Sequence, residues 1–283
     1  MMKKYLAKIF KSLGISIVAV ILVTIGINAS DHYNNLSESI VGKLILDEPK
    51  NFCPDDMVFI LSDNGGFCID KYEVSADPKC PYLNPDNQTM TKKNLDDPNC
   101  YPVSIAGAVP WRNISQIQAM TACAKAGKRL PTNEEWFLAA LGTPDLHEGW
   151  SINDCHVASN WKTQPGLTGT GIKCVSSAGA YDMIGNVWEW VKGEIKDGVY
   201  KGNTLPSSGY IQAVDINGLP IESDDINPNL NYNEDYLWLK NKGIRGISRG
   251  GYWNNKSDAG LFSVYLVSRS SFSGAGVGFR CAK

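Results

Sequence analysis

The segment that most restricts the fold of this chain is residues 179–191, which gathers two glycines and two tryptophans around Asn186 and Glu189. A tight turn at its second glycine should lead into a strand, in which successive side chains point to opposite faces. Val187, Glu189 and Val191 would share one face, and the tryptophans would occupy the other. A carboxylate buried in such a strand costs several kcal/mol without a partner. Glu189 should therefore have a cationic partner.

Two kinds of partner remain open for Glu189. The side-chain oxygens of Asn186 and Glu189, together with nearby carbonyls, could form a site for a hard cation such as Ca²⁺. We therefore predict structural calcium at four residues, Asn186, Val187, Glu189 and Val191. The alternative is a core strand whose acid pairs with an arginine, and Arg129 is a candidate for that role.

The stretch Gly185–Val191 resembles the central motif of the formylglycine-generating enzyme, or sulfatase-modifying factor, family. Further blocks agree with that family in the same order, namely Cys68–Val74, Ala126–Trp136, and finally Arg249–Trp253 with Gly278–Cys281. The resemblance covers most of residues 55–283. It implies an α+β fold, a variant of the C-type lectin fold with little regular secondary structure and braced by disulfides.

Eight cysteines indicate an oxidising compartment, and none forms the C-x-x-C pair of zinc ribbons or thioredoxin-like sites. The family resemblance implies one disulfide, Cys123–Cys281, which would tie the C-terminus to the first half of the domain. The simplest local pairs for the other six cysteines are Cys53–Cys68, Cys80–Cys100 and Cys155–Cys174. Buried free thiols are the alternative.

The beginning of the chain differs from the rest. Residues 1–12 are basic, and an apolar run follows with no charge between Lys11 and Asp31. We expect residues 13–29 to be a transmembrane anchor, with the lysines inside the cell and the domain outside. A cleaved signal peptide, and so a secreted protein, is the alternative.

Residues 30–50 read as a linker, and residues 51–283 as the sulfatase-modifying-factor-like domain. Within it, residues 192–244 are acidic, rich in turn residues and outside the family motifs, so we expect a surface insertion. The chain has a formal net charge of −2, and residues 1–30 contribute +4, so the remainder carries −6. A nucleic-acid partner is not expected, because binding to phosphates needs a basic face.

Local signals predict a few elements around these motifs. Two β-rich runs, 57–61 and 67–74, flank a turn sequence and read as a hairpin. Ser115 with Gln118, and Thr132 with Glu135, have capping-box spacing and predict two helix starts. Residues 75–110 are rich in turn signals and read as an inserted loop closed by cysteines.

No catalytic residue is assigned. The family's oxidase holds Cu(I) with two cysteine thiolates just after the Arg-Gly-Gly motif, and soft thiolates suit that metal. Residues 252–262 contain no cysteine, and Asn254 stands where the first ligand is expected, so copper is not expected. A second enzymatic branch needs a histidine-rich iron site, for which His32, His147 and His156 are too few. No nucleophile turn of a hydrolase is present.

The remaining interpretation is a binding module. Residues 252–276 resemble the variable region of proteins diversified by retroelements, framed by a Gly-Gly-Tyr-Trp-Asn-Asn opening and a Gly-Phe-Arg-Cys close. Aromatic and small polar side chains suit recognition. The candidate contact residues are Trp253, Asn254, Lys256, Ser257, Phe262, Tyr265, Val267, Ser268, Ser270 and Phe272. The alternative places Phe262, Tyr265 and Val267 in the core, since only one face of a strand at 261–267 can be exposed.

The sequence thus favours a membrane-anchored, extracytoplasmic binding protein whose ligand is an unidentified protein or glycan. An enzyme of the same family with altered chemistry is the second interpretation. A structural protein of the cell envelope is the third.

Overall fold

The computed structural model describes residues 53–62 and 65–283. Within these ranges, no helix combines the length and the apolar character that a membrane crossing needs. The predicted basic segment, anchor and linker (1–12, 13–29 and 30–50) lie outside the described residues.

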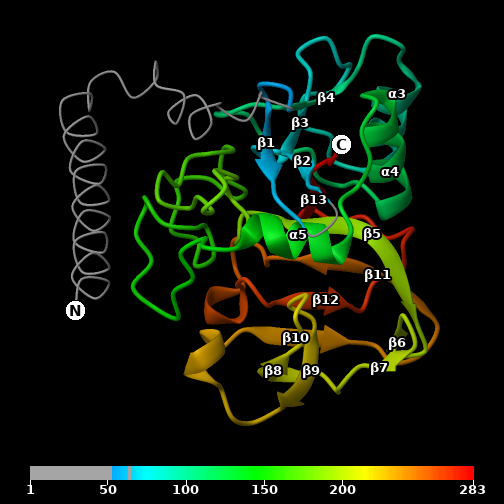
Figure 1. The fold of residues 1–283 in the computed structure, drawn as a ribbon. Coiled ribbons are helices and arrows are strands. Elements are labelled where there is room, and N and C mark those ends of the chain that lie inside the picture. The colour runs from blue at the N-terminus through cyan, green and yellow to red at the C-terminus, as the bar shows by residue number, and fades with distance from the viewer. Residues whose placement is uncertain (1–52, 63–64) are drawn as a thin grey trace, which may run out of the picture. The chain divides into compact units, whose positions relative to one another are not determined.

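The fold is organised around one mixed sheet, which Figure 1 shows running from β7 to β9. Its strands follow the order β7-β6-β5-β11-β12-β10-β8-β9, and β13 pairs in parallel with β5. Their bounds are β5 Trp188–Lys196, β6 Val199–Tyr200, β7 Asn203–Thr204, β8 Gly209–Val214, β9 Pro220–Asp224, β10 Tyr236–Leu239, β11 Ile244–Arg249, β12 Val264–Leu266 and β13 Val277–Phe279.

Two small sheets and three α-helices complete the domain. The predicted hairpin is present as β1 and β2, which pair antiparallel, and β3 pairs with β4. The bounds are β1 Met57–Ile60, β2 Phe67–Asp70, β3 Val74–Ala76, β4 Pro102–Ser104, α3 Gln88–Asp96, α4 Gln116–Lys125 and α5 Asn133–Ala140, with short 3₁₀ turns η2 Leu230–Tyr232 and η3 Lys256–Asp258.

The two predicted helix starts are confirmed. Reciprocal capping boxes join Ser115 to Gln118 before α4 and Thr132 to Glu135 before α5. Helix α3 was not predicted, because its sequence is polar on all sides and lies among turn residues. Asn87 starts it, since the Asn87 side chain accepts the N–H groups of the second and third helical residues.

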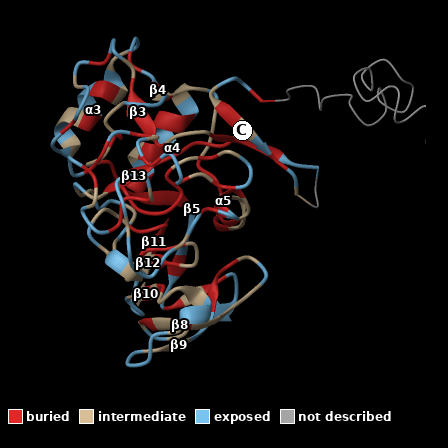
Figure 2. Ribbon diagram, turned by 90° about the vertical axis from the view of Figure 1, so that its left-hand side faces the viewer, coloured by how far each residue is buried: buried red, intermediate tan, exposed pale blue. Residues whose placement is uncertain are grey.

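Both faces of the central sheet are buried around β5 and β11. On one face, Val191 and Ile247 pack in a core cluster with Trp136 of α5. On the other face, Trp188 and Trp190 pack with residues of α4. The predicted alternation of the 187–191 strand is therefore confirmed, and Figure 2 shows buried residues concentrated along β5 and β11.

The interpretation of residues 192–244 as a surface excursion was wrong. This segment contains the second half of β5 and all of β6–β10, which are strands of the central sheet. Ile195, Ile211 and Leu237 are fully buried in the core cluster that contains Trp136. The strands are short and separated by acidic turns, so the acidic composition concealed their buried positions.

All four predicted disulfides are present, and no cysteine among the described residues is free. Cys123–Cys281 closes a sequence separation of 158 residues and joins α4 to the residues after β13. The other three bridges close separations of 15, 20 and 19 residues.

We predict that the long bridge contributes most to stability, because a crosslink removes more unfolded-chain entropy when its loop is longer. The double variant Cys123→Ser/Cys281→Ser should lose about 3–5 kcal/mol of unfolding free energy in urea. The matched control, Cys53→Ser/Cys68→Ser, closes a much shorter loop and should lose less. Equal losses in the two double variants would contradict this ranking.

Candidate ligand-binding face and buried carboxylate cluster

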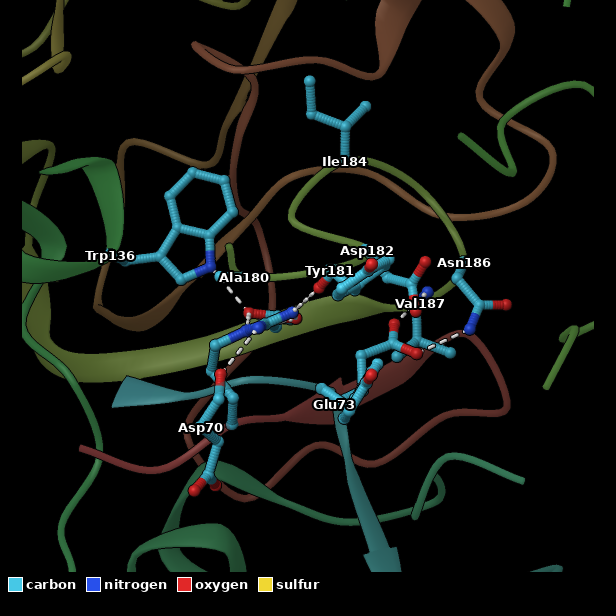
Figure 3. Close-up of polar contacts among 12 residues, drawn as sticks. Asp70, Glu73, Trp136, Ala180, Tyr181, Asp182, Ile184, Asn186 and Val187 are labelled. Carbon is cyan, nitrogen blue, oxygen red and sulfur yellow. Dashed lines mark hydrogen bonds and ion pairs between the residues drawn. The ribbon is translucent and has the colours of Figure 1, made fainter. Parts of the chain in front are cut away.

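Glu189 has its partner within the protein. The Arg280 guanidinium donates from Nε to both carboxylate oxygens, at 2.9 and 2.7 Å, and from Nη2 to Oε1. Trp136 Nε1 donates to Oε2 at 2.7 Å, as Figure 3 shows. Glu189 therefore pairs with an arginine, which was the alternative left open by the sequence. That arginine is not Arg129, whose guanidinium forms a bidentate pair with Glu135.

Three of the four residues predicted to bind calcium have oxygens that accept hydrogen bonds in this arrangement. Asn186 accepts the Gly166 N–H at Oδ1, and both oxygens of Glu189 accept N–H groups. The Val191 carbonyl accepts the side-chain amide of Gln116. The Val187 N–H points at a carboxylate, Glu73. The oxygens of Asn186, Glu189 and Val191 thus face hydrogen-bond donors, so the calcium prediction at this segment finds no support in the geometry.

The same cluster holds more carboxylates than arginines. Glu73 and Asp182 are buried near the Glu189–Arg280 pair. Burial, followed by the charges of Asp182 and Glu189, holds the pKa of Glu73 well above its usual range. Burial likewise raises the pKa of Asp182 to about 7, against the opposing effects of the Gly169 N–H and Arg280. Asp182 Oδ1 is buried and has no hydrogen-bond partner in the described part of the chain.

Asp182 should make stability depend on pH. Its pKa is raised on folding, so its contribution is fully present below about pH 4 and is lost as pH rises through about 7. Asp182→Asn removes the charge and keeps a residue type suited to the positive φ of 56° at this position. In urea unfolding, the free energy of unfolding of the variant minus that of wild type should rise by about 1–3 kcal/mol between pH 5 and pH 8.

The control for that comparison is Glu222→Gln, because the Glu222 side chain is exposed on β9. Its stability difference from wild type should stay flat over the same pH range. A flat difference for Asp182→Asn as well would show that the buried carboxylate does not titrate there.

The ten residues predicted to contact a ligand are all at least partly exposed, but they do not form one surface. Phe262 packs onto the core side, against Phe137 and Tyr232 with ring centroids 5.8 and 5.2 Å away. Val267 lines a separate polar hollow of about 420 Å³ at the end of β10. Only Tyr265 and Phe272 line the aromatic groove described next.

The aromatic groove is a hollow of about 390 Å³ on the face of the sheet opposite α5. Its lining residues are Trp188, Trp238, Tyr252, Asn255, Tyr265, Phe272, Gly274, Ala275, Gly276 and Val277. None of them is charged. The groove therefore suits an uncharged ligand surface, and five of its ten lining residues are aromatic.

Strand alternation and register place these rings. On β10, Tyr236 and Trp238 point outward, and Leu237 between them is fully buried. Trp238 lies opposite Tyr265 of β12, and Tyr236 lies opposite Tyr210 of β8, so each pair shares a face.

The rings continue as a row beyond the groove. Trp188–Trp238, Trp238–Tyr236 and Tyr236–Tyr210 have centroid separations of 5.4, 4.8 and 5.2 Å. Figure 1 shows α3, α4 and α5 near the β5 end of the sheet, away from β10 and β8. No α-helix within residues 53–62 and 65–283 therefore covers the aromatic side chains at this end of the face.

Sequence reasoning missed five of these aromatic residues, one of which, Tyr252, lies within residues 252–276 but was not a candidate contact. Tyr210, Tyr236 and Trp238 fall in the segment interpreted as an insertion, and Trp188 was assigned to the core strand. A signal for two of them was available, because Tyr236-Leu237-Trp238-Leu239 alternates as a half-buried strand does.

Comparisons with known proteins agree with the motifs. Residues 62–283 match the family model of the sulfatase-modifying factor enzyme 1-like domain. The inactive C-alpha-formylglycine-generating enzyme 2 of Bos taurus is 28% identical over 120 residues, which are 38% of this chain and 40% of that protein. The chain thus spans less than half the length of that curated relative.

Solved structures with a similar fold are more distant. The Major Tropism Determinant I1 variant has 18% identity and a TM-score of 0.43, covering 83% of this chain and 54% of its own. Treponema denticola variable protein 1 has 15% identity and a TM-score of 0.40, covering 81% and 99%. Likeness at this level carries no information about function.

Proposed function

This chain belongs to the family of sulfatase-modifying factor enzyme 1-like domains, and we propose that it is a ligand-binding member and not an oxidase. The observation that carries the proposal is the uncharged aromatic groove on the outer face of the sheet. Its ligand is an uncharged segment of a protein or glycan outside the cell. The basic and apolar residues 1–29 would anchor the domain in the membrane.

The groove has the features of a recognition surface. Its tryptophan and tyrosine rings pack against one another and rest on backbone strands, so little side-chain freedom is lost when a ligand binds. Large rigid rings provide much contact area for each side chain immobilised. Asn255 supplies the polar side chain among the lining residues, and its Oδ1 already accepts the Tyr252 N–H.

The cysteines support the same choice. The family's oxidase needs two thiolates for Cu(I), whereas all eight cysteines of this chain form disulfides in the structure. Asn254, at the position expected for the first copper ligand, has an amide side chain that cannot replace a thiolate. Four disulfides also favour an oxidising compartment outside the cytoplasm.

We predict that Trp238 is needed for binding. The full chain would be screened on arrays of neutral oligosaccharides and of peptides, and any ligand found would be measured by calorimetry. Trp238→Ala should lower the affinity for that ligand at least tenfold, because truncating a central aromatic anchor costs about 2 kcal/mol or more of binding free energy. Trp238 is only partly buried, so the melting temperature should change by a few degrees at most.

The matched control is Trp253→Ala. Trp253 is also partly exposed and stacks edge-on against Tyr252, but it does not line the groove. Its truncation should weaken binding less than threefold. A large loss with Trp253→Ala and none with Trp238→Ala would move the site to the exposed loop at 253–257 and overturn the groove.

The resemblance to diversified proteins generates a separate prediction. Sequencing of this gene from its native population should show substitutions crowding into codons 252–276 and sparing 278–283. The spared residues are constrained physically, because Phe279, Arg280 and Cys281 are fully buried and Arg280 neutralises Glu189. Variation spread evenly across the domain would remove diversification from the proposal and leave a fixed binding site.

A further inference from the structure

Two acidic side chains from distant segments meet beside a glycine. Asp145 follows α5, Asp235 precedes β10, and both reach the loop between η3 and β12. Asp145 Oδ2 accepts the Leu261 N–H at 2.9 Å, and Asp235 Oδ2 accepts the Phe262 N–H at 2.7 Å. The two carboxylates therefore hold successive residues of one loop.

The carboxylates converge over Gly260. A Cβ atom at that position would lie 1.8 Å from Asp235 Oδ1 and 2.6 Å from Asp145 Oδ2, so these oxygens are no farther apart than the sum, 4.4 Å. Any side chain at 260 would occupy the space between them. The two carboxylates can approach each other here because residue 260 is glycine.

One oxygen of each carboxylate has nothing to bind. Asp235 is fully buried and Asp145 partly exposed, yet Oδ1 of each is buried and has no hydrogen-bond partner within residues 53–62 and 65–283. A buried carboxylate oxygen without a partner costs free energy. The Asp235 Oδ1 points into the space over Gly260, where the Asp145 carboxylate also lies.

No basic side chain of the described chain forms an ion pair with either acid. The charge of Arg249 acts on Asp235 from a distance. The Arg249 guanidinium itself donates to the carbonyls of Gly218, Leu261 and Phe262 and lies over the Trp136 ring. Its hydrogen bonds therefore go to backbone, and the two carboxylates face each other without a bonded counter-charge.

We propose that Asp145 and Asp235 bind one divalent cation over Gly260, and that calcium is the cation their chemistry favours. Both donors are hard carboxylate oxygens, which calcium accepts in flexible geometry together with carbonyls and water. No third acidic, histidine or cysteine side chain in the described chain completes a larger group. The remaining ligands would be backbone or amide oxygens and water.

Such a cation would hold three segments together: the residues after α5, the turn before β10 and the loop before β12. Tyr236 directly follows Asp235, and β12, which follows the loop, carries Tyr265, so the site adjoins the beginnings of two strands that carry the aromatic rings. It uses none of the residues 186–191.

The test is a calcium titration of the full chain after removal of metal with EDTA. Calcium at about a hundredfold above its Kd should raise the melting temperature by about 5 °C. Metal analysis should find one calcium per chain in addition to any bound elsewhere. Magnesium should give a smaller shift, because it demands stricter octahedral geometry.

Asp145→Asn should abolish the calcium shift. This variant should fold, because part of the Asp145 side chain is exposed to solvent. Asp235→Asn serves as the second variant. Glu222→Gln, an exposed acid on β9, should keep the full shift.

Two outcomes would overturn the proposal. One is no shift in the wild-type protein with calcium. The other is a shift that survives in Asp145→Asn and Asp235→Asn, which would place the calcium elsewhere. A third result would mean that the two carboxylates share a proton instead of binding a cation. In that case wild type in EDTA is stabilised by lowering the pH to 5, the variants lose this pH response, and calcium has no effect.

Discussion

The buried ion pair between Arg280 and Glu189 is the interaction on which the rest of the domain depends. It joins β5 to the residue after β13, and the Trp136 indole of α5 donates to the same carboxylate. Arg280 also donates to the backbone carbonyls of Asp70 and Tyr181. Removing one partner of such a buried pair costs about 3–5 kcal/mol, because the other charge is left uncompensated. Four segments far apart in sequence, at residues 70, 136, 181–189 and 280, thus meet at this ion pair.

The burial of the central sheet changes with distance from this ion pair. Around it, both faces of the sheet are buried by α4 and α5, so β5 and β11 form a rigid base. Farther along the sheet, β12, β10 and β8 keep one face in the core and turn aromatic rings outward on the other. A recognition surface on strands is held more firmly than one on a loop, because pairing with neighbours fixes each side chain's position and face.

Glu189 and the Asp145–Asp235 pair lie in two different kinds of surroundings. Glu189 has a bidentate arginine and an indole, which leave no oxygen for a metal. Asp145 and Asp235 each accept a backbone N–H on Oδ2, have the Asn233 and Ser263 side chains beside them, and approach each other over a glycine. The residues singled out by the sequence for calcium thus have their side-chain oxygens occupied by hydrogen-bond donors, whereas the pair proposed to bind a cation has no recognisable spacing in the sequence.

The family, the α+β class, four disulfide pairs, the hairpin, two capped helices and the two faces of the 187–191 strand could all be predicted from the sequence. Those features rest on local spacing and on motifs, which the linear chain contains. The structure was needed to show that Arg280 is the partner of Glu189, that residues 192–244 build half of the sheet, and that Trp238 contacts Tyr265. The reason is that pairing between distant strands and charges follows from register and packing, and neither leaves a periodic mark on the sequence.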